Sequence, residues 1–402
     1  MSAPLANIRI LDLSRILAGP WASQLLADYG ADVVKVERPD VGDDTRHWGP
    51  PWLNGTVGES AYFQSANRNK RSICLDLATD RGQKILRELG MQADVLIENF
   101  KVGTMARFGL GAADLEKLNP RLIFCSISAY GQTGSRAEEP GYDAMIQASA
   151  GLMSITGPAE DDGGRPQKVG VAISDLMAGM YATTAILAAL HERSHSGRGQ
   201  YIDIPLYDSQ VAGLANQAMN YLIGGFVPSR MGTAHPNLVP YQSFQTADGD
   251  LMLAVGNDRQ FARACDALEL PELADDGRFK TMARRIEHRD VLVPLLQARL
   301  RLESRDHWLT VLQQHEVPAG PVNTIDEVLG NDQAKERDLV RHIRNGRGLD
   351  VPTISNPVRF TKTPVAYRLA PPSLGEHTDE VLRDWLGYSE AAIQTLKKNE
   401  TK

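Results

Sequence analysis

Hydrophobic residues in the first 130 positions occur in short runs that alternate with amphipathic stretches. Short apolar runs at 8–13, 32–37, 72–77, 94–98 and 122–127 predict strands, and residues 201–206 predict a later one. Residues 19–29 and 80–91 have the spacing of helices. Strands separated by helices of about ten residues are typical of βαβ units. The pattern therefore predicts an α/β fold with a doubly wound parallel sheet.

The pattern changes after a glycine- and proline-bearing stretch at residues 224–229. Two strands at 241–246 and 251–255 flank an Asp-Gly-Asp turn, and helical segments follow at 258–268, 291–302 and 307–314. This region predicts a smaller α+β domain. The proline-rich residues 340–372 suggest an extended connection, and 378–386 and 389–396 predict closing helices capped by Thr378 and Ser389. We place the domains at residues 1–224, 225–330 and 331–402.

Composition excludes several function classes. The chain has 402 residues with 42% hydrophobic and 23% charged residues, which is typical of a globular protein. A net charge of −7 argues against a nucleic-acid surface. The three cysteines have no disulfide or metal-ligand spacing, and no apolar run was expected to reach the roughly 18 residues that span a bilayer. The N-terminus has no export signal pattern. We expect a cytoplasmic protein with no metal site and no membrane partner.

Nucleotide-binding fingerprints are missing from this sheet-forming sequence. No G-x-G-x-x-G follows the first predicted strand, and no G-x-x-x-x-G-K-[ST] occurs anywhere. These motifs hold pyrophosphate on backbone N–H groups. Their absence disfavours a nicotinamide dehydrogenase or a P-loop enzyme.

Asp175 is a lone carboxylate among small and apolar residues. An alanine-rich apolar run, residues 176–190, follows it directly. A helix that begins at Asp175 would place the carboxylate at its N-terminus, where backbone N–H groups and the helix dipole keep it ionised. The segment alone favours a helix cap over a nucleophile.

Six segments in order resemble the class III coenzyme A transferases, the CaiB/BaiF family, nearly end to end. They are residues 10–20 (ILDLSRILAGP), 30–37 (GADVVKVE), 69–72 (NKRS), 94–100 (DVLIENF), 197–200 (GRGQ) and 374–378 (LGEHT). The resemblance implies a large Rossmann-like domain, a small domain, a C-terminal segment that returns to the large domain, and two chains interlocked like rings in a homodimer.

The resemblance also assigns roles to residues. The family's catalytic aspartate corresponds to Asp175, which would form a mixed anhydride with the donor acyl group and then an aspartyl–CoA thioester. An aspartate with a pKa of ~3.9 is ionised at neutral pH and needs no general base. The CoA thioester is a substrate, and no permanently bound cofactor is expected. The residues that correspond to CoA contacts are Ile16, Leu17, Arg38, Leu75, Asn99, Phe100, Arg107 and Tyr142.

Two alternatives follow from the same scaffold. The family also contains 2-methylacyl-CoA racemases, whose second acid–base group is a histidine in a Gly-His-Asp turn. The corresponding turn here is Gly141-Tyr142-Asp143, and tyrosine, with a pKa near ~10, is a poor base at neutral pH. A catalytically silent acyl-CoA sensor is the other alternative, and the intact aspartate argues against it.

Residues 230–244 narrow the choice of acceptor acid, because they resemble the succinyl-CoA:glutarate subgroup of the family. A dicarboxylate needs a cationic or hydrogen-bonding partner for its second carboxylate. Each candidate also has a structural alternative: an ion pair with Glu37 or Asp44 for the arginines, packing for the tryptophan and a turn cap for the histidine. The candidates for substrate contact are Arg15, Arg46, Trp48, Gly232 and His235. Leu17 stands where the formyl-transferring branch has glutamine, which disfavours formate and oxalate.

Overall fold

The computed structural model describes residues 3–55, 57–160 and 163–398, which form two compact units. Unit 1 comprises the described residues within Met1–Leu152, Val169–Leu222 and Gln333–Lys402. Unit 2 comprises those within Met153–Lys168 and Ile223–Asp332. The domain boundaries expected from sequence stay a prediction.

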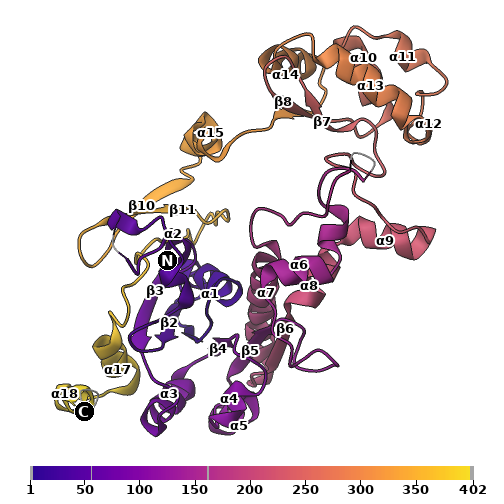
Figure 1. Ribbon diagram of the computed structural model, residues 1–402. Coiled ribbons are helices and arrows are strands. Elements are labelled where there is room, and N and C mark those ends of the chain that lie inside the picture. Colours follow the sequence, from indigo (N-terminus) through magenta and orange to yellow (C-terminus); the bar gives the residue numbers. More distant parts are fainter. Residues whose placement is uncertain (1–2, 56, 161–162, 399–402) are drawn as a thin grey trace. The chain divides into compact units, whose positions relative to one another are not determined.

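A six-stranded parallel sheet forms the centre of unit 1 (Figure 1). The strand order is β3-β2-β1-β4-β5-β6. The first three strands are added outward from β1 to one edge of the sheet, and the last three are added outward from β4 to the other edge. The predicted parallel sheet is confirmed. The strands are β1 (Arg9–Asp12), β2 (Asp32–Glu37), β3 (Lys70–Cys74), β4 (Val95–Glu98), β5 (Ile123–Ser128) and β6 (Tyr201–Pro205).

Two apolar clusters cover the faces of this sheet. One includes Leu86 and Leu89 of α3 together with Leu382 and Trp385 of the C-terminal helix α17 (Thr378–Leu386), and the other includes alanines of α1 and α7. The helices of unit 1 that precede the C-terminal segment are α1 (Ala18–Asp28), η1 (Asp44–His47), η2 (Leu53–Gly55), α2 (Ala61–Ser65), α3 (Asp80–Gln92), α4 (Thr104–Arg107), α5 (Ala112–Leu118), α6 (Asp143–Ser149), α7 (Ile173–Ser196) and α8 (Leu206–Gly213). Three described helices, η3 (Leu152–Ile155), α9 (Ala215–Gly224) and α16 (Asp332–Glu336), span boundaries between the units.

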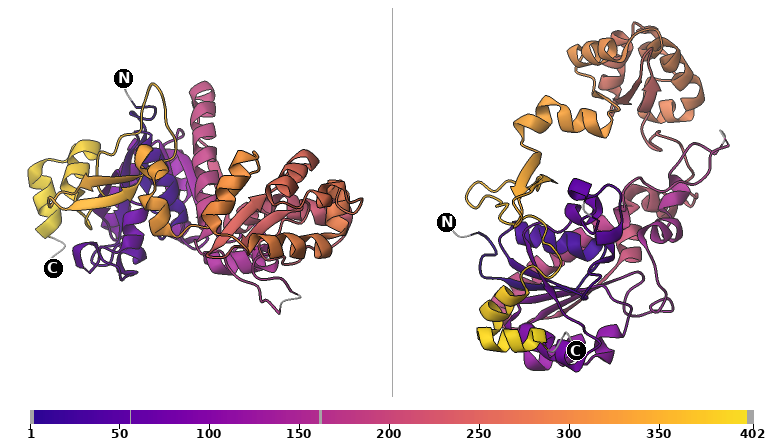
Figure 2. Two further views of the ribbon diagram at one scale, coloured as in Figure 1. Left: turned by 90° about the horizontal axis from the view of Figure 1, so that it is seen from above. Right: turned by 60° about the vertical axis from the view of Figure 1, so that its left-hand side comes forward.

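The C-terminal segment lies against the N-terminal part of unit 1. Helix α17 (Thr378–Leu386) packs on α3 and β3 and is followed by α18 (Glu390–Lys398), drawn in yellow beside the indigo elements in both views of Figure 2. The expected extended connection at 340–372 contains an antiparallel hairpin, β10 (Val340–Arg344) with β11 (Asp350–Ile354), after α16 (Asp332–Glu336). The sequence did not predict this hairpin because proline usually argues against a strand. Pro352 is tolerated here because both strands of a two-stranded ribbon are edge strands.

Unit 2 contains a three-stranded antiparallel sheet in the order β7-β8-β9, built from β7 (Tyr241–Gln245), β8 (Asp250–Ala254) and β9 (Ala319–Pro321). Buried leucines and phenylalanines join the sheet to its helices. These helices are α10 (Asp258–Ala267), α11 (Glu272–Asp275), α12 (Met282–Glu287), α13 (Arg289–Leu300), α14 (Arg305–Gln314) and α15 (Ile325–Gly330).

Three local predictions need correction. Helix α7 begins at Ile173, so Asp175 is its third residue and not its N-cap. The third strand covers Lys70–Cys74 and not 72–77, because its register follows β2, where Glu37 pairs with Cys74. Thr378 does not cap α17, since its hydroxyl donates to the Gly375 carbonyl, whereas the Ser389 hydroxyl accepts the Ala392 N–H as expected.

Helix α7 is also longer than the apolar run suggested. It has 24 residues and is long and apolar enough to cross a membrane by length and composition alone. One side of it is buried: Ala178, Ala182 and Ile186 belong to the apolar cluster beneath the sheet, and the helix packs along α1. A buried core helix has this same composition.

Candidate active site

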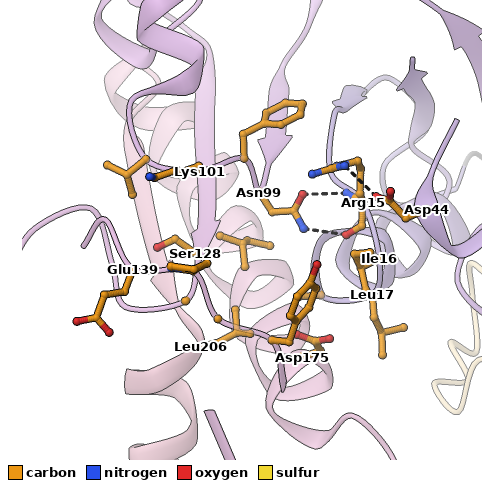
Figure 3. Close-up of a pocket in the computed structure, with 18 of the residues that line it drawn as sticks. Arg15, Ile16, Leu17, Asp44, Asn99, Lys101, Ser128, Glu139, Asp175 and Leu206 are labelled. Carbon is orange, nitrogen blue, oxygen red and sulfur yellow. Dashed lines mark hydrogen bonds and ion pairs between the residues drawn. The ribbon is translucent and has the colours of Figure 1, made fainter. Parts of the chain in front are cut away.

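A cavity of about 440 Å³ opens at the carboxyl ends of β1, β4 and β5 (Figure 3). In this sheet the strand order reverses between β1 and β4, and open α/β sheets bind ligands at such a reversal. The loops after the three strands, the turn before α6 and the start of α7 form the walls. The lining residues are Arg15, Ile16, Leu17, Ala18, Asp44, Trp48, Asn99, Phe100, Lys101, Val102, Ile127, Ser128, Ala129, Ala137, Glu139, Pro140, Gly141, Tyr142, Asp175 and Leu206.

The loop after β1 is held by side chains that bind its backbone. Asn99, at the end of β4, accepts the Arg15 N–H at 2.8 Å and donates to the Arg15 carbonyl at 2.7 Å. The Asp43 carboxylate accepts the Ile16 N–H at 3.2 Å. Ile16 has φ +71°, a left-handed conformation that is strained for a β-branched residue. Such strain persists only where the surroundings fix the backbone, as these contacts do.

Buried ion pairs anchor this loop from beneath. Lys35 donates to the Ser14 carbonyl at 2.8 Å and pairs with Asp43 at 2.9 Å, with both side chains fully buried. Lys70 pairs with Asp12 at 3.0 Å in the same interior. Burial alone would raise the pKa of Asp12, but the two lysines hold it at about 2. Burial lowers the pKa of Lys70 to about 8 despite Asp12. Removing one partner of such a pair would leave an uncompensated buried charge.

Asp175 lies in the wall of the cavity and is only 8% exposed. Burial, and to a smaller extent the nearby Asp143, raise the pKa of its carboxyl from 3.8 to about 7. This corrects the expectation of an unperturbed, fully ionised aspartate. The helix start does not stabilise its charge as expected, because Asp143 occupies that position: its Oδ1 accepts the Ser174 N–H at 2.8 Å and the Asp175 N–H at 3.4 Å.

Most of the residues predicted from the family resemblance line this one cavity, although they come from five separate segments. They are Arg15, Ile16, Leu17, Trp48, Asn99, Phe100, Tyr142 and Asp175. Arg38 and Arg107 are exposed and lie outside the lining. Leu75 is buried in the core and lines a different cavity of about 380 Å³ beside α17.

The two arginines proposed for substrate contact differ in their surroundings. Arg46 is buried, forms a two-pronged pair with Glu37 at 2.7 and 2.8 Å, and lies over the Phe63 ring. The ion pair with Glu37, which was the alternative to substrate contact, therefore describes Arg46. Arg46 does not line the cavity. Arg15 pairs with Asp44 at 2.8 Å, but both side chains are about half exposed at the cavity. Such an exposed pair is weak, and the substrate role of Arg15 stays a prediction.

Sequence reasoning missed two residues of this site. Lys101 lines the cavity and directly follows Asn99 and Phe100. Its position next to two predicted CoA contacts could have indicated that it belongs to the site. Asp143 was noted only as part of a turn. Its contact with the start of α7 spans 31 positions of sequence, and no local pattern indicates it.

Gly232 and His235 belong to unit 2, and their substrate role stays a prediction. The His235 Nδ1 accepts the Asn237 N–H at 3.0 Å, as a turn-capping histidine would. Burial and Arg289 lower the pKa of His235. Among the described residues, no group of three or more His, Cys, Asp or Glu side chains is arranged to hold a metal ion.

Comparison with known proteins adds to this geometry. Residues 5–378 match the family described as CoA-transferase family III. The chain is 45% identical over 401 residues to the succinate–glutarate CoA-transferase of Agrobacterium fabrum, covering 99% of this chain and 98% of that protein. It is 44% identical over 393 residues to the succinyl-CoA:glutarate CoA-transferase of Mus musculus, covering 98% and 89%. The crystal structure of a CAIB/BAIF family protein from Brucella suis matches with a TM-score of 0.84 at 44% identity, covering 96% of this chain and all of that one.

Proposed function

Because the chain belongs to CoA-transferase family III and is a CoA-transferase, we propose that it moves CoA between succinyl-CoA and glutarate through covalent intermediates on Asp175. The Agrobacterium fabrum and Mus musculus relatives are named for transfer between these two acids. The observation that carries the mechanism is the buried Asp175 carboxylate in the wall of the cavity.

The proposed reaction steps balance in atoms and charge without an external acid or base. An Asp175 carboxylate oxygen attacks the thioester carbonyl of succinyl-CoA; a C–O bond forms, the C–S bond breaks, and CoA leaves as a thiolate. The thiolate attacks the Asp175 carbonyl of the mixed anhydride, which releases succinate and leaves an aspartyl–CoA thioester. Glutarate then attacks this thioester, and the steps run in reverse to give glutaryl-CoA. Covalent catalysis divides one exchange into easier steps.

The environment of Asp175 suits this role. The raised pKa reports that the charged carboxylate is unfavourable where it lies. An anhydride or thioester at this position carries no charge, so formation of either removes the unfavourable charge. A carboxylate in such a place is more reactive toward a thioester than one stabilised by hydrogen bonds.

The racemase alternative gains nothing from the structure. Among the described residues that line the cavity, none is a histidine, and Tyr142 is 63% exposed. Inversion at the 2-position needs two acid–base groups on opposite faces of the substrate. Asp175 supplies one such group only.

We also propose that the protein is a homodimer. Large apolar side chains are exposed on α7 and α9, including Met180, Tyr181, Met219, Tyr221 and Leu222. Exposed apolar patches mark interaction surfaces. Light scattering coupled to gel filtration is expected to give twice the chain mass, and a monomer at micromolar concentration would contradict the proposal.

A transfer assay tests the function. Succinyl-CoA is mixed with glutarate, itaconate, mesaconate, malate or hydroxymethylglutarate, and the CoA esters are separated by chromatography. Glutaryl-CoA is expected to form fastest, and Asp175→Asn is expected to abolish transfer. The control Asp208→Asn alters an exposed aspartate in the first turn of α8 and is expected to retain it. Undiminished transfer by Asp175→Asn would refute the mechanism, and transfer to every acid except glutarate would refute the acceptor. Deuterium entering the 2-position of a branched acyl-CoA in D2O would instead support racemisation.

A further inference from the structure

The Asp143 carboxylate joins the start of α6 to the start of α7. Its Oδ1 accepts the Ser174 N–H at 2.8 Å and the Asp175 N–H at 3.4 Å, and its Oδ2 accepts an N–H of the Gln147 amide at 2.6 Å. Gln147 is fully buried, and its Oε1 accepts the Val169 N–H at 2.8 Å. Both oxygens of Asp143 are therefore fixed by donors from two segments, the first turn of α7 and Gln147 of α6.

This contact replaces the cap that α7 otherwise lacks. The N-cap residue Ala172 offers no side-chain acceptor, and the first-turn N–H groups need partners. Asp143 binds two of them, including the N–H of Asp175 itself. Donors that would stabilise a negative charge on the Asp175 carboxylate are thus already bound to another carboxylate.

We propose that Asp143 is a positioning residue for the transfer reaction: it fixes the first turn of α7 so that Asp175 faces the cavity, and its charge disfavours the ionised form of Asp175 relative to the covalent intermediates. This proposal rests on the proposed function. Asp143 does not line the cavity and touches no reacting atom in this account.

The electrostatic consequence follows from the charge balance of the reaction. Free enzyme carries a negative charge on Asp175, whereas the anhydride and the aspartyl–CoA thioester carry none there. Repulsion from Asp143 is present only before acylation, so it favours the covalent intermediates. Burial and Asp143 are the two causes of the raised pKa of Asp175.

Other charged or titratable groups surround the site from neighbouring elements. Tyr62 of α2 faces both aspartates, and burial followed by Asp175 and Asp143 raises its pKa to about 12, so it stays neutral at physiological pH. The remaining charged groups that line the cavity are Arg15, Asp44, Lys101 and Glu139. None of these four is among the causes of the raised pKa of Asp175.

The test uses Asp143→Asn in the full-length protein. Asparagine keeps an oxygen that accepts the Ser174 N–H but removes the charge. The pH profile of single-turnover adduct formation with succinyl-CoA is measured, together with the fraction of enzyme present as adduct at equilibrium with succinyl-CoA and succinate. We expect the pH midpoint to move to lower pH and the adduct fraction to fall several-fold.

The matched control is Ser174→Ala, which removes the buried hydrogen bond from the Ser174 hydroxyl to Gln210 Oε1 but changes no charge. Its pH midpoint is expected to equal that of the wild type, even if its stability falls. Asp143→Ser also removes the charge and serves as a second uncharged variant if the asparagine variant does not fold. Its midpoint is also expected to move to lower pH.

The outcomes separate the two proposals. If the wild type forms no adduct on Asp175, the proposed function fails. If the wild type forms the adduct, but the uncharged variants keep its pH midpoint and adduct fraction, the role of Asp143 is refuted and the function stands.

Discussion

Asp175→Asn is expected to make the protein more stable while it abolishes transfer. The substitution replaces a buried carboxylate by a neutral side chain of the same shape. Because the folded-state pKa is raised from 3.8 to about 7, the folded protein binds a proton that the unfolded chain releases. Folding stability is therefore lost as pH rises from about 4 to about 7, and the loss is constant above that range.

The magnitude follows from the two pKa values. Each unit of pKa corresponds to about 1.4 kcal/mol, so the ionised Asp175 costs about 4 kcal/mol above pH 8, and about 1.7 kcal/mol of this loss is present at pH 5. The difference in free energy of unfolding between Asp175→Asn and the wild type is expected to grow by about 2.5 kcal/mol from pH 5 to pH 8.

The assay is urea denaturation of both proteins at several pH values, followed by tryptophan fluorescence. Four of the five tryptophans lie in unit 1, so the signal reports mainly on the unit that contains Asp175. The control Asp208→Asn is expected to change stability by less than about 1 kcal/mol at every pH. A stability gain for Asp175→Asn that is the same at pH 5 and pH 8, or no gain at either, would refute the reasoning.

Three further predictions follow from the site. The kcat/KM for succinyl-CoA is expected to rise with pH and to level off above about 7, because only the ionised Asp175 attacks the thioester; a rate that is flat down to pH 5 would contradict this. Asn99→Ala removes two hydrogen bonds to the Arg15 backbone and, at about 1 kcal/mol each, is expected to raise KM for succinyl-CoA about tenfold or more; an unchanged KM would show that the loop keeps its shape without them. Lys35→Met leaves Asp43 buried without its partner and is expected to lower the free energy of unfolding by roughly 3–5 kcal/mol. Arg15→Ala breaks an exposed pair and is expected to lower it by less than about 1 kcal/mol. Equal losses for the two variants in urea denaturation would contradict the role of burial.

The sequence indicated the strands of the parallel sheet well, because each is a short apolar run bounded by polar residues. The family resemblance placed Asp175, Asn99 and Ile16 in one site, and the structure brings all three to one cavity. Local pattern did not reveal the true start of α7, since its cap comes from Asp143, 31 positions earlier.

The raised pKa of Asp175 and the charge pairing around the site could also not be predicted from the sequence. Hydrophobic pattern shows which residues are apolar, but not that Asp175 is desolvated or that a second carboxylate lies beside it. The same limit applies to Arg46, for which an ion pair with Glu37 and a substrate contact were both compatible with the sequence. Only the fold shows that Glu37 faces Arg46 in the interior.

The most direct test of covalent catalysis on Asp175 is the intact mass of the protein after mixing with succinyl-CoA and trapping with hydroxylamine. An aspartyl–CoA thioester or anhydride is converted by hydroxylamine to an aspartyl hydroxamate, which peptide mapping locates. We predict a hydroxamate at Asp175 in the wild type and none in Asp175→Asn. An unmodified Asp175 in an enzyme that still transfers CoA would contradict the account.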